Sequence, residues 1–264
     1  MTILTAYIDG IGLLGPGFND WTGSRDVLAG IEPYRPQPTV VPAPAALPPA
    51  ERRRCGPIVK VSLAVGQQAA TAAGRDVASL PTVFSASGGD GNNCHEICAM
   101  LASDDRLISP TRFHNSVHNA AAGYWSIANK ATAPSSVLCA YDASFGAGLL
   151  EAITQTVVDD TATLLIACDT TYPEPLRQSR PIPDEFGVGM LLAPRRGERT
   201  LAQISVALTD APADRLGDAV LEQLRLAIPA ARSLPLLGAI ARRAEASMVL
   251  DYLDGTRLAL QVAP

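Results

Sequence analysis

The stretch that decides the fold is Ser136–Gly148, SVLCAYDASFGAG in one-letter code. Its first half, Ser136–Tyr141, has the apolar and β-branched character of a strand, and Ala147–Val158 has the pattern of a following helix. A residue at such a sharp turn faces the helix N-terminus, where the helix dipole and free N–H groups favour an anion or a nucleophile. Asp142 occupies this turn. Judged by residue type alone, an N-cap is a more frequent role for this aspartate than catalysis.

Strand and helix patterns alternate on both sides of this turn. Gly10-Ile11-Gly12 is interpreted as the turn that closes the first strand, and the prolines concentrated in residues 32–50 predict an irregular surface strap. The alternation predicts an α/β protein with a sheet packed between helices. The predicted strands are residues 3–9, 80–87, 136–141 and 163–169, and the predicted helices are residues 57–74, 94–103 and 147–158.

The last third of the chain has a different pattern. Residues 186–192 and 201–208 are predicted as two strands of a hairpin, joined by a charged turn at 195–199. Helical patterns follow at residues 216–227 and 236–243. A final hairpin is predicted at residues 248–252 and 257–262, around Asp254-Gly255. This remainder is too short for another complete α/β layer.

Composition narrows the class of protein. The chain has 264 residues and 47% hydrophobic content, enough for a substantial core in one large or two small domains. The net charge is −5, and Arg52–Arg54 is the one basic run, which argues against nucleic acid as a partner. The N-terminus lacks a charged region before an apolar stretch, and the apolar runs are shorter than a membrane span. We therefore expect a soluble cytoplasmic protein without a membrane span.

The five cysteines predict reduced thiols. Their odd number, their irregular spacing and the lack of an export signal argue against a disulfide framework. Cys139 and Cys168 lie in apolar runs, where a thiol behaves as a small core residue.

Two possible ligand sites are better explained without a ligand. Ser87–Gly91 is rich in glycine but matches no nucleotide-binding motif, so a strand-to-helix turn is favoured over a phosphate cradle. His114 and His118 have the i, i+4 spacing of a zinc-binding pair, but no H-E-x-x-H motif is present, and the spacing identifies neither Cys94 nor His95 as a third ligand. We therefore expect packing or polar contacts from these histidines, with no metal and no cofactor.

Several segments together resemble a known family. Ile108-Ser109-Pro110, Asn119, Ala122-Gly123, Pro134 and Tyr141–Gly148 are similar to the N-terminal half of β-ketoacyl synthases of the thiolase fold. A closer resemblance is to short ketosynthase-like proteins of aryl-polyene and xanthomonadin-type pigment clusters, which are similar to chain length factors. The segments that carry it are Pro48-Pro49, Arg53-Arg54-Cys55, Phe84–Ser87, Gly89–Gly91, Phe113–Asn119 and Tyr141–Phe145.

This resemblance implies a particular fold and organisation. The expected fold is the thiolase-like N-terminal half of a ketosynthase, a mixed sheet packed between helices. Residues 1–208 would form the ketosynthase-like domain. Residues 209–264 would be a reduced C-terminal remnant, a helix plus a hairpin, packed on the same domain.

Two departures from the family pattern imply that the chain has no catalytic activity of its own. By position, Asp142 replaces the nucleophilic cysteine, and a carboxylate cannot serve as the thiolate that accepts an acyl chain. The family's two catalytic histidines come from the C-terminal half, whereas this sequence has no histidine after His118. The groups that would stabilise an oxyanion during condensation are therefore missing.

Ketosynthases are dimers, so the resemblance also implies a partner. The expected partner is an active ketosynthase, in a heterodimer or a larger assembly that handles acyl carrier protein with its growing acyl or polyene chain. Residues 137–141 would lie at the subunit seam, and residues 111–118 would face the partner's acyl tunnel and limit product length. The candidate interface and tunnel residues are Thr111, Arg112, Phe113, His114, His118, Asn119, Val137, Leu138, Cys139, Ala140, Tyr141 and Phe145.

Two other functions are compatible with the sequence. One is a stand-alone hydrolase or decarboxylase that acts on an acyl thioester through Asp142, with His114 or His118 nearby. At a helix N-terminus, however, Asp142 would be a weak base. The other is a homodimeric scaffold that binds acyl carrier protein.

Overall fold

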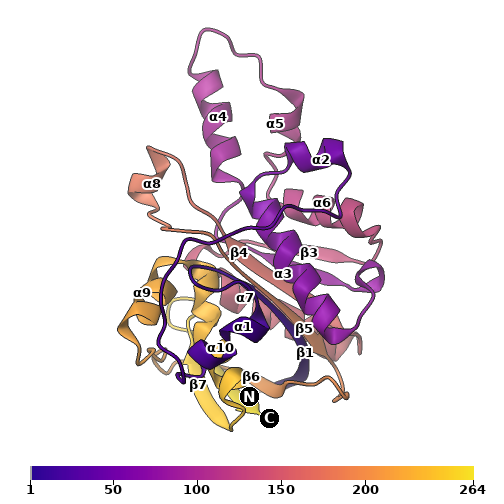
Figure 1. Ribbon diagram of the computed structural model, residues 1–264, viewed down its shortest axis with the longest axis vertical. Coiled ribbons are helices and arrows are strands. Elements are labelled where there is room, and N and C mark those ends of the chain that lie inside the picture. The colour runs from indigo at the N-terminus through magenta and orange to yellow at the C-terminus, as the bar shows by residue number, and fades with distance from the viewer. Residues whose placement is uncertain (1) are drawn as a thin grey trace.

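A computed structural model describes residues 2–264, which form one mixed sheet with helices on both faces (Figure 1). The strand order is β3-β2-β4-β5-β1-β6-β8-β7. The strands are β1 (Leu4–Leu14), β2 (Thr82–Ser85), β3 (Ser135–Leu138), β4 (Thr163–Asp169), β5 (Phe186–Ala193), β6 (Ala202–Thr209), β7 (Ala246–Leu250) and β8 (Arg257–Ala263). The α-helices are α1 (Trp21–Leu28), α2 (Pro49–Arg54), α3 (Pro57–Ala73), α4 (Gly91–Leu101), α5 (Pro110–His114), α6 (Ala120–Asn129), α7 (Ser144–Val158), α8 (Leu176–Ser179), α9 (Ala219–Ala227) and α10 (Leu234–Arg242).

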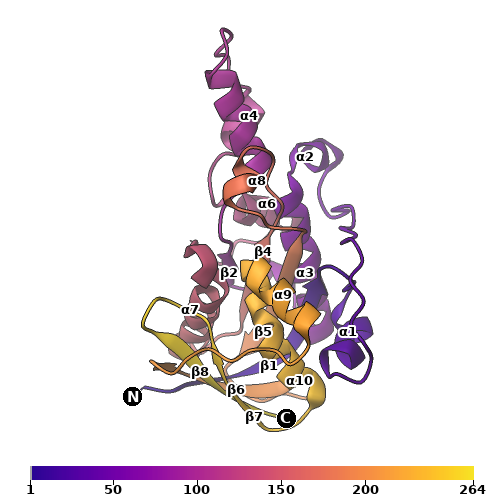
Figure 2. The same ribbon diagram turned by 90° about the vertical axis from the view of Figure 1, so that its left-hand side faces the viewer.

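The sheet separates two hydrophobic cores. Side chains alternate along β4, so that Leu164 and Ile166 pack with α3 and α6, whereas Leu165 packs with α7 and α10 on the other face. Figure 2 shows α3 and α7 on opposite sides of the sheet. Strands β2, β3 and β4 are parallel, and β5 is antiparallel to both of its neighbours, β4 and β1. The predicted mixed sheet packed between helices is confirmed.

The first strand is longer than the sequence predicted, and its two glycines do not form a turn. Gly10 and Gly12 lie inside β1, where α3 crosses the sheet at close range. A Cβ atom at Gly10 would lie 2.2 Å from the carbonyl oxygen of Ala69, and one at Gly12 would lie 2.0 Å from that of Val65. The two glycines therefore allow α3 to pack closely on β1. A close approach by another backbone is a known reason for glycine inside a strand.

The hairpin predicted from residues 186–192 and 201–208 is wrong. Strands β5 and β6 do not pair with each other, because β1 lies between them and pairs with both. The connection passes the middle of β1, where the amide of Leu201 donates to the carbonyl of Ile8 at 2.7 Å. A local turn pattern cannot show that a strand almost two hundred residues away will lie between the two predicted strands.

Most other predicted elements are confirmed within a few residues. Helix α3 ends as predicted at Gly74, which adopts a left-handed conformation with φ of 63°. The predicted strand at residues 163–169 is β4, and Ser87–Gly91 is a strand-to-helix turn in which Asp90 caps α4. Residues 33–44 of the proline-rich strap have no regular structure, as predicted. Helices α1, α2, α5, α6 and α8 were not predicted.

The C-terminal segment continues the same sheet. The predicted final hairpin is confirmed as β7 and β8, and β8 pairs with β6 along seven residues of each strand. Helix α10 packs in the same core as α7. The division at residue 208 stays a prediction. Among residues 2–264, no helix combines the length and apolar character needed to cross a bilayer.

The close packing of α3 on β1 yields a stability prediction. We expect Gly12→Ala to lower the free energy of unfolding by about 3 kcal/mol or to prevent folding, because its Cβ would collide with a backbone carbonyl that cannot move alone. Gly217→Ala is the matched control, since a Cβ there meets no atom within 4 Å. Urea unfolding followed by circular dichroism measures both. Equal unfolding midpoints for Gly12→Ala and the unmutated protein would contradict the packing argument.

Candidate functional site

The turn between β3 and α7, which we call the elbow (residues 139–143), is held by hydrogen bonds within the segment. Strand β3 ends at Leu138, a short 3₁₀ turn spans Tyr141–Ala143, and α7 begins at Ser144. The hydroxyl of Ser144 accepts from the amide of Ala140 at 3.0 Å and donates to the carbonyl of Tyr141 at 2.7 Å. These two bonds hold the elbow against the first turn of α7.

Asp142 is not an N-cap, contrary to the interpretation based on residue type alone. The capping residue of α7 is Ala143, and no side chain caps the helix. Instead, the Asp142 carboxylate forms ion pairs with Arg180, from the loop between β4 and β5, and with Arg232 at 3.4 Å, from the C-terminal segment. The local sequence shows neither arginine, so the ion pairs could not be predicted from the turn.

Arg180 connects Asp142 to the neighbouring aromatic ring. Its guanidinium lies 3.8 Å from the centre of the Tyr141 ring, a cation–π contact. Although burial opposes the charge, the hydrogen bond and the negative charge of Asp142 raise the pKa of Arg180 above its ordinary value. The side chain of Arg180 is only 16% exposed, so this pairing satisfies a mostly buried cation.

A cleft of about 500 Å³ opens beside the elbow. Its walls come from the elbow and from the C-terminal segment, and both acidic and basic side chains line it. Neither His114 nor His118 is among the lining residues, so the structure does not place a histidine with Asp142 in this cleft. The lining residues are Ala140, Tyr141, Asp142, Ala143, Arg232, Asp251, Tyr252, Leu253, Asp254 and Arg257.

A second acidic residue, Asp169, ties the C-terminal segment to the end of the sheet. Its buried carboxylate accepts from the amide and hydroxyl of Ser87, at 2.9 and 2.5 Å, and from the amide of Ala230 at 2.8 Å. Burial raises the pKa of Asp169 to about 6, although these hydrogen bonds act in the opposite direction. In the sequence, this residue is visible only as the last position of a predicted strand.

The two cysteines expected in the core differ in the structure. Cys168 is buried, as predicted, with its sulfur 3.0 Å from the hydroxyl of Ser62, and burial raises its pKa to about 12. The prediction for Cys139 is wrong: this thiol is exposed and donates to the carbonyl of Ser87 at 3.3 Å. The reason is that β3 ends at Leu138, three residues before the predicted end of the strand.

Several other predicted site residues, Thr111–His114 and His118, lie on a projection formed by α4 and α5, seen at the top of Figures 1 and 2. Thr111, Arg112, Phe113 and His114 belong to α5. This helix ends at His114, so His114 and His118 do not share a helical face, and the spacing argument for a zinc pair is wrong. In residues 2–264, no group of three His, Cys, Asp or Glu side chains is placed to hold a metal ion.

The projection, residues 91–118, is anchored at its base. Arg112 pairs with Glu96 of α4 at 3.2 Å, and the amide side chain of Asn93 donates to the carbonyl of Arg112 at 2.8 Å. Asn115 donates to the carbonyl of Arg54 in α2 at 2.8 Å. The side chain of Phe113, in contrast, is 68% exposed.

Five of the predicted interface residues fall into three groups: two line a small cavity, two are exposed and one is buried. His118 and Val137 line the same small cavity, so the end of the projection meets β3 there. Burial lowers the pKa of His118, whose Nε2 has no hydrogen-bond partner among residues 2–264. Tyr141 and Asn119 are exposed, whereas Phe145 is fully buried in the core beside α7 and contributes nothing to the surface.

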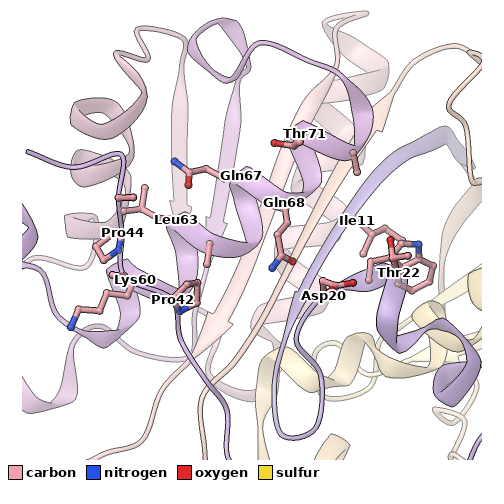
Figure 3. A pocket seen from close by; sticks show the side chains of 15 residues that line it. Ile11, Asp20, Thr22, Pro42, Pro44, Lys60, Leu63, Gln67, Gln68 and Thr71 are labelled. Carbon is pink, nitrogen blue, oxygen red and sulfur yellow. The ribbon is translucent and has the colours of Figure 1, made fainter.

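A second sizeable cavity lies elsewhere. It has a volume of about 560 Å³ and separates the proline-rich strap from α3, with Lys60 and Asp20 among its lining residues (Figure 3). None of the predicted site residues lines it.

The buried carboxylate of Asp169 predicts a pH dependence. Because its folded-state pKa is near 6 rather than 3.8, the folded protein binds more protons than the unfolded chain between these values. This residue's contribution to stability is therefore present below pH 4 and lost as the pH rises through 6, by about 3 kcal/mol. We expect Asp169→Asn to lack this slope. Urea unfolding from pH 4 to 7 tests the difference, and parallel curves for both proteins would contradict it.

Comparison with known proteins places the chain in a family. A model of the β-ketoacyl synthase N-terminal domain matches residues 29–243. No curated protein sequence matches the chain. Among solved structures, a ketosynthase in complex with its chain length factor from Xenorhabdus doucetiae matches with a TM-score of 0.74 and 21% identity, over 98% of this chain and 99% of that chain.

Two further solved structures have the same fold. A type II polyketide synthase acyl-carrier protein in complex with its ketosynthase bound to the hexaketide matches with a TM-score of 0.75 and 13% identity, over 99% of both chains. The ishigamide ketosynthase/chain length factor matches with a TM-score of 0.71 and 14% identity, over 98% of this chain and 99% of that chain. These matches confirm the expected thiolase-like fold. Since the domain model spans more than half of the sequence, the chain belongs to the β-ketoacyl synthase N-terminal domain family.

Proposed function

We propose that this chain is a non-catalytic, chain-length-factor-like partner of an active β-ketoacyl-acyl carrier protein synthase. In this proposal the two subunits form a heterodimer, and this chain shapes the acyl tunnel during polyketide-type synthesis of an aryl polyene. The observation that carries the proposal is the elbow, where two arginines hold the carboxylate of Asp142. By the family resemblance, this aspartate takes the position of the nucleophile.

The contacts of Asp142 argue against covalent catalysis. Acyl transfer through the elbow needs a nucleophile that is free to attack and a group that takes up its proton. The carboxylate of Asp142 is already paired with Arg180 and Arg232, and no histidine lines its cleft. This arrangement favours a structural role over the alternative of a hydrolase or decarboxylase that uses Asp142.

The two edges of the sheet favour association through β3. At the β7 edge, Asp214 accepts from the amide of Val249 through its side chain and donates to the carbonyl of Val249 through its backbone, both at 2.9 Å. At the β3 edge, Ser135–Leu138 pairs with β2 on its inner side, and no strand of residues 2–264 pairs with it on its outer side. An open edge is a template for pairing with another chain, whereas a covered one is protected. The protected edge of the sheet is therefore the β7 edge, and the open edge is the one next to the elbow.

The projection of α4 and α5 supplies apolar surface for the same partner. Leu107, Phe113 and Val117 are 80%, 68% and 51% exposed. Large apolar side chains gathered on one exposed segment are typical of a protein interface. We propose that Thr111 and Phe113 extend into the partner's acyl tunnel, where their bulk limits the length of the product.

The solved complexes support this choice of partner. One of the matched structures contains a ketosynthase with its chain length factor, and another contains a ketosynthase with an acyl-carrier protein. By analogy we propose that an acyl carrier protein delivers the growing chain to the heterodimer. A homodimeric scaffold that binds acyl carrier protein is the competing assembly.

Co-expression with the candidate ketosynthase tests the proposal. We expect a heterodimer in size-exclusion chromatography and chain elongation that requires both subunits. Asp142→Asn keeps an oxygen for one arginine, so we expect an intact heterodimer with elongation within about twofold of the unmutated complex. Loss of elongation in an intact Asp142→Asn heterodimer would show that the carboxylate acts in catalysis. A chain that never co-purifies with a ketosynthase would refute the partnership.

Product length tests the tunnel assignment. We expect Phe113→Ala to lengthen the main product and Thr111→Trp to shorten it, since bulk in the tunnel limits chain growth. Leu226→Ala is the matched control, because this side chain is 59% exposed on α9, outside the projection. Mass spectrometry of the released chains gives the length distribution. The same distribution for all three variants would remove α5 from the tunnel.

A further inference from the structure

Tyr141 has an unusual backbone conformation. Its φ is 52°, in the left-handed region that a bulky aromatic residue rarely adopts. The other non-glycine residues with positive φ are Lys130, Asp160 and Arg243, which lie just beyond the ends of α6, α7 and α10. Tyr141 instead lies in the middle of the elbow, between a strand and a helix. A strained residue persists only where its surroundings hold it, and such residues gather at functional sites.

The strain determines which side chain the elbow presents. In enzymes with a nucleophile on a strand-to-helix turn, the nucleophile occupies the strained residue and faces outward. Here the strained residue is Tyr141, one position before Asp142. Tyr141 is 60% exposed, whereas the carboxylate of Asp142 is turned toward Arg180 and Arg232. By this criterion the residue that the elbow presents is a tyrosine.

The ring of Tyr141 is held in place in the isolated chain. The guanidinium of Arg180 lies 3.8 Å from the centre of the ring, and Asp142 in turn pairs with that guanidinium. An exposed aromatic side chain that is already ordered loses little conformational entropy when a partner covers it. The three side chains thus form an ordered unit with an open aromatic face.

The position of Tyr141 in the fold indicates which partner would cover its ring. Tyr141 follows the last residue of β3 by three positions, so it lies close to the open edge of the sheet, and its exposed ring also lines the cleft beside the elbow. We propose that Tyr141 is the anchor residue of the interface with the ketosynthase, and that its ring enters a pocket of apolar side chains on that subunit. This inference rests on the proposed heterodimer. Buried tyrosines are among the residues that contribute most to binding at protein interfaces.

Two substitutions at Tyr141 distinguish an anchor residue from a side chain that only stabilises the fold. Tyr141→Gly removes the ring and also removes the backbone strain, since glycine adopts positive φ freely. We expect the unfolding midpoint of the isolated variant to stay unchanged or to rise. We expect its affinity for the ketosynthase to fall at least about 30-fold, equivalent to about 2 kcal/mol. Tyr141→Phe keeps the ring and should retain affinity within about threefold.

Arg243→Gly is the matched control. It replaces another residue with positive φ, at the end of α10 beside the covered β7 edge, and should leave the affinity unchanged. Surface plasmon resonance with the immobilised ketosynthase measures all four proteins. Tyr141→Gly with unmutated affinity, or with a lowered unfolding midpoint, would overturn the anchor. If the unmutated chain fails to bind, the proposed heterodimer fails and the anchor with it, an outcome distinct from normal binding by Tyr141→Gly.

Discussion

The ion pairs of Asp142 join three parts of the chain that are far apart in sequence. The elbow contributes the carboxylate, the loop between β4 and β5 contributes Arg180, and the C-terminal segment contributes Arg232. The side chains of Arg180 and Arg232 are 16% and 15% exposed. Removal of the carboxylate would therefore leave two mostly buried cations without this partner. Such cations are costly, because their lost hydration must be replaced by a partner. The position of the elbow therefore depends on the C-terminal segment, which contributes Arg232.

A second carboxylate reinforces the same junction. Asp169 at the end of β4 accepts hydrogen bonds from the loop after β2 and from Ala230 in the tail. The C-terminal segment is thus held at two points, by the partly exposed ion pair of Arg232 and by the buried hydrogen bond of Ala230. Because β8 also extends the sheet through β6, the C-terminal residues belong to the same core as α7.

The sheet has one protected edge and one open edge, and this asymmetry connects fold to proposed function. Asp214 bonds to the backbone groups of Val249 at the β7 edge, whereas no strand of residues 2–264 pairs with the outer side of β3 at the other edge. The exposed apolar residues of the projection add a second surface for association. The open edge and the exposed projection are the features on which the proposed heterodimer rests.

The sequence by itself determined the class of fold, because periodic patterns and turn residues are local. It located α3, β4 and the final hairpin, and it identified Asp142 at the elbow through the family resemblance. Only the tertiary structure decided the insertion of β1 between β5 and β6, the exposure of Cys139, and the partners of Asp142. These features depend on contacts between residues from tens of positions to about two hundred positions apart. Local propensity carries no record of such contacts, because the packing of distant segments creates them.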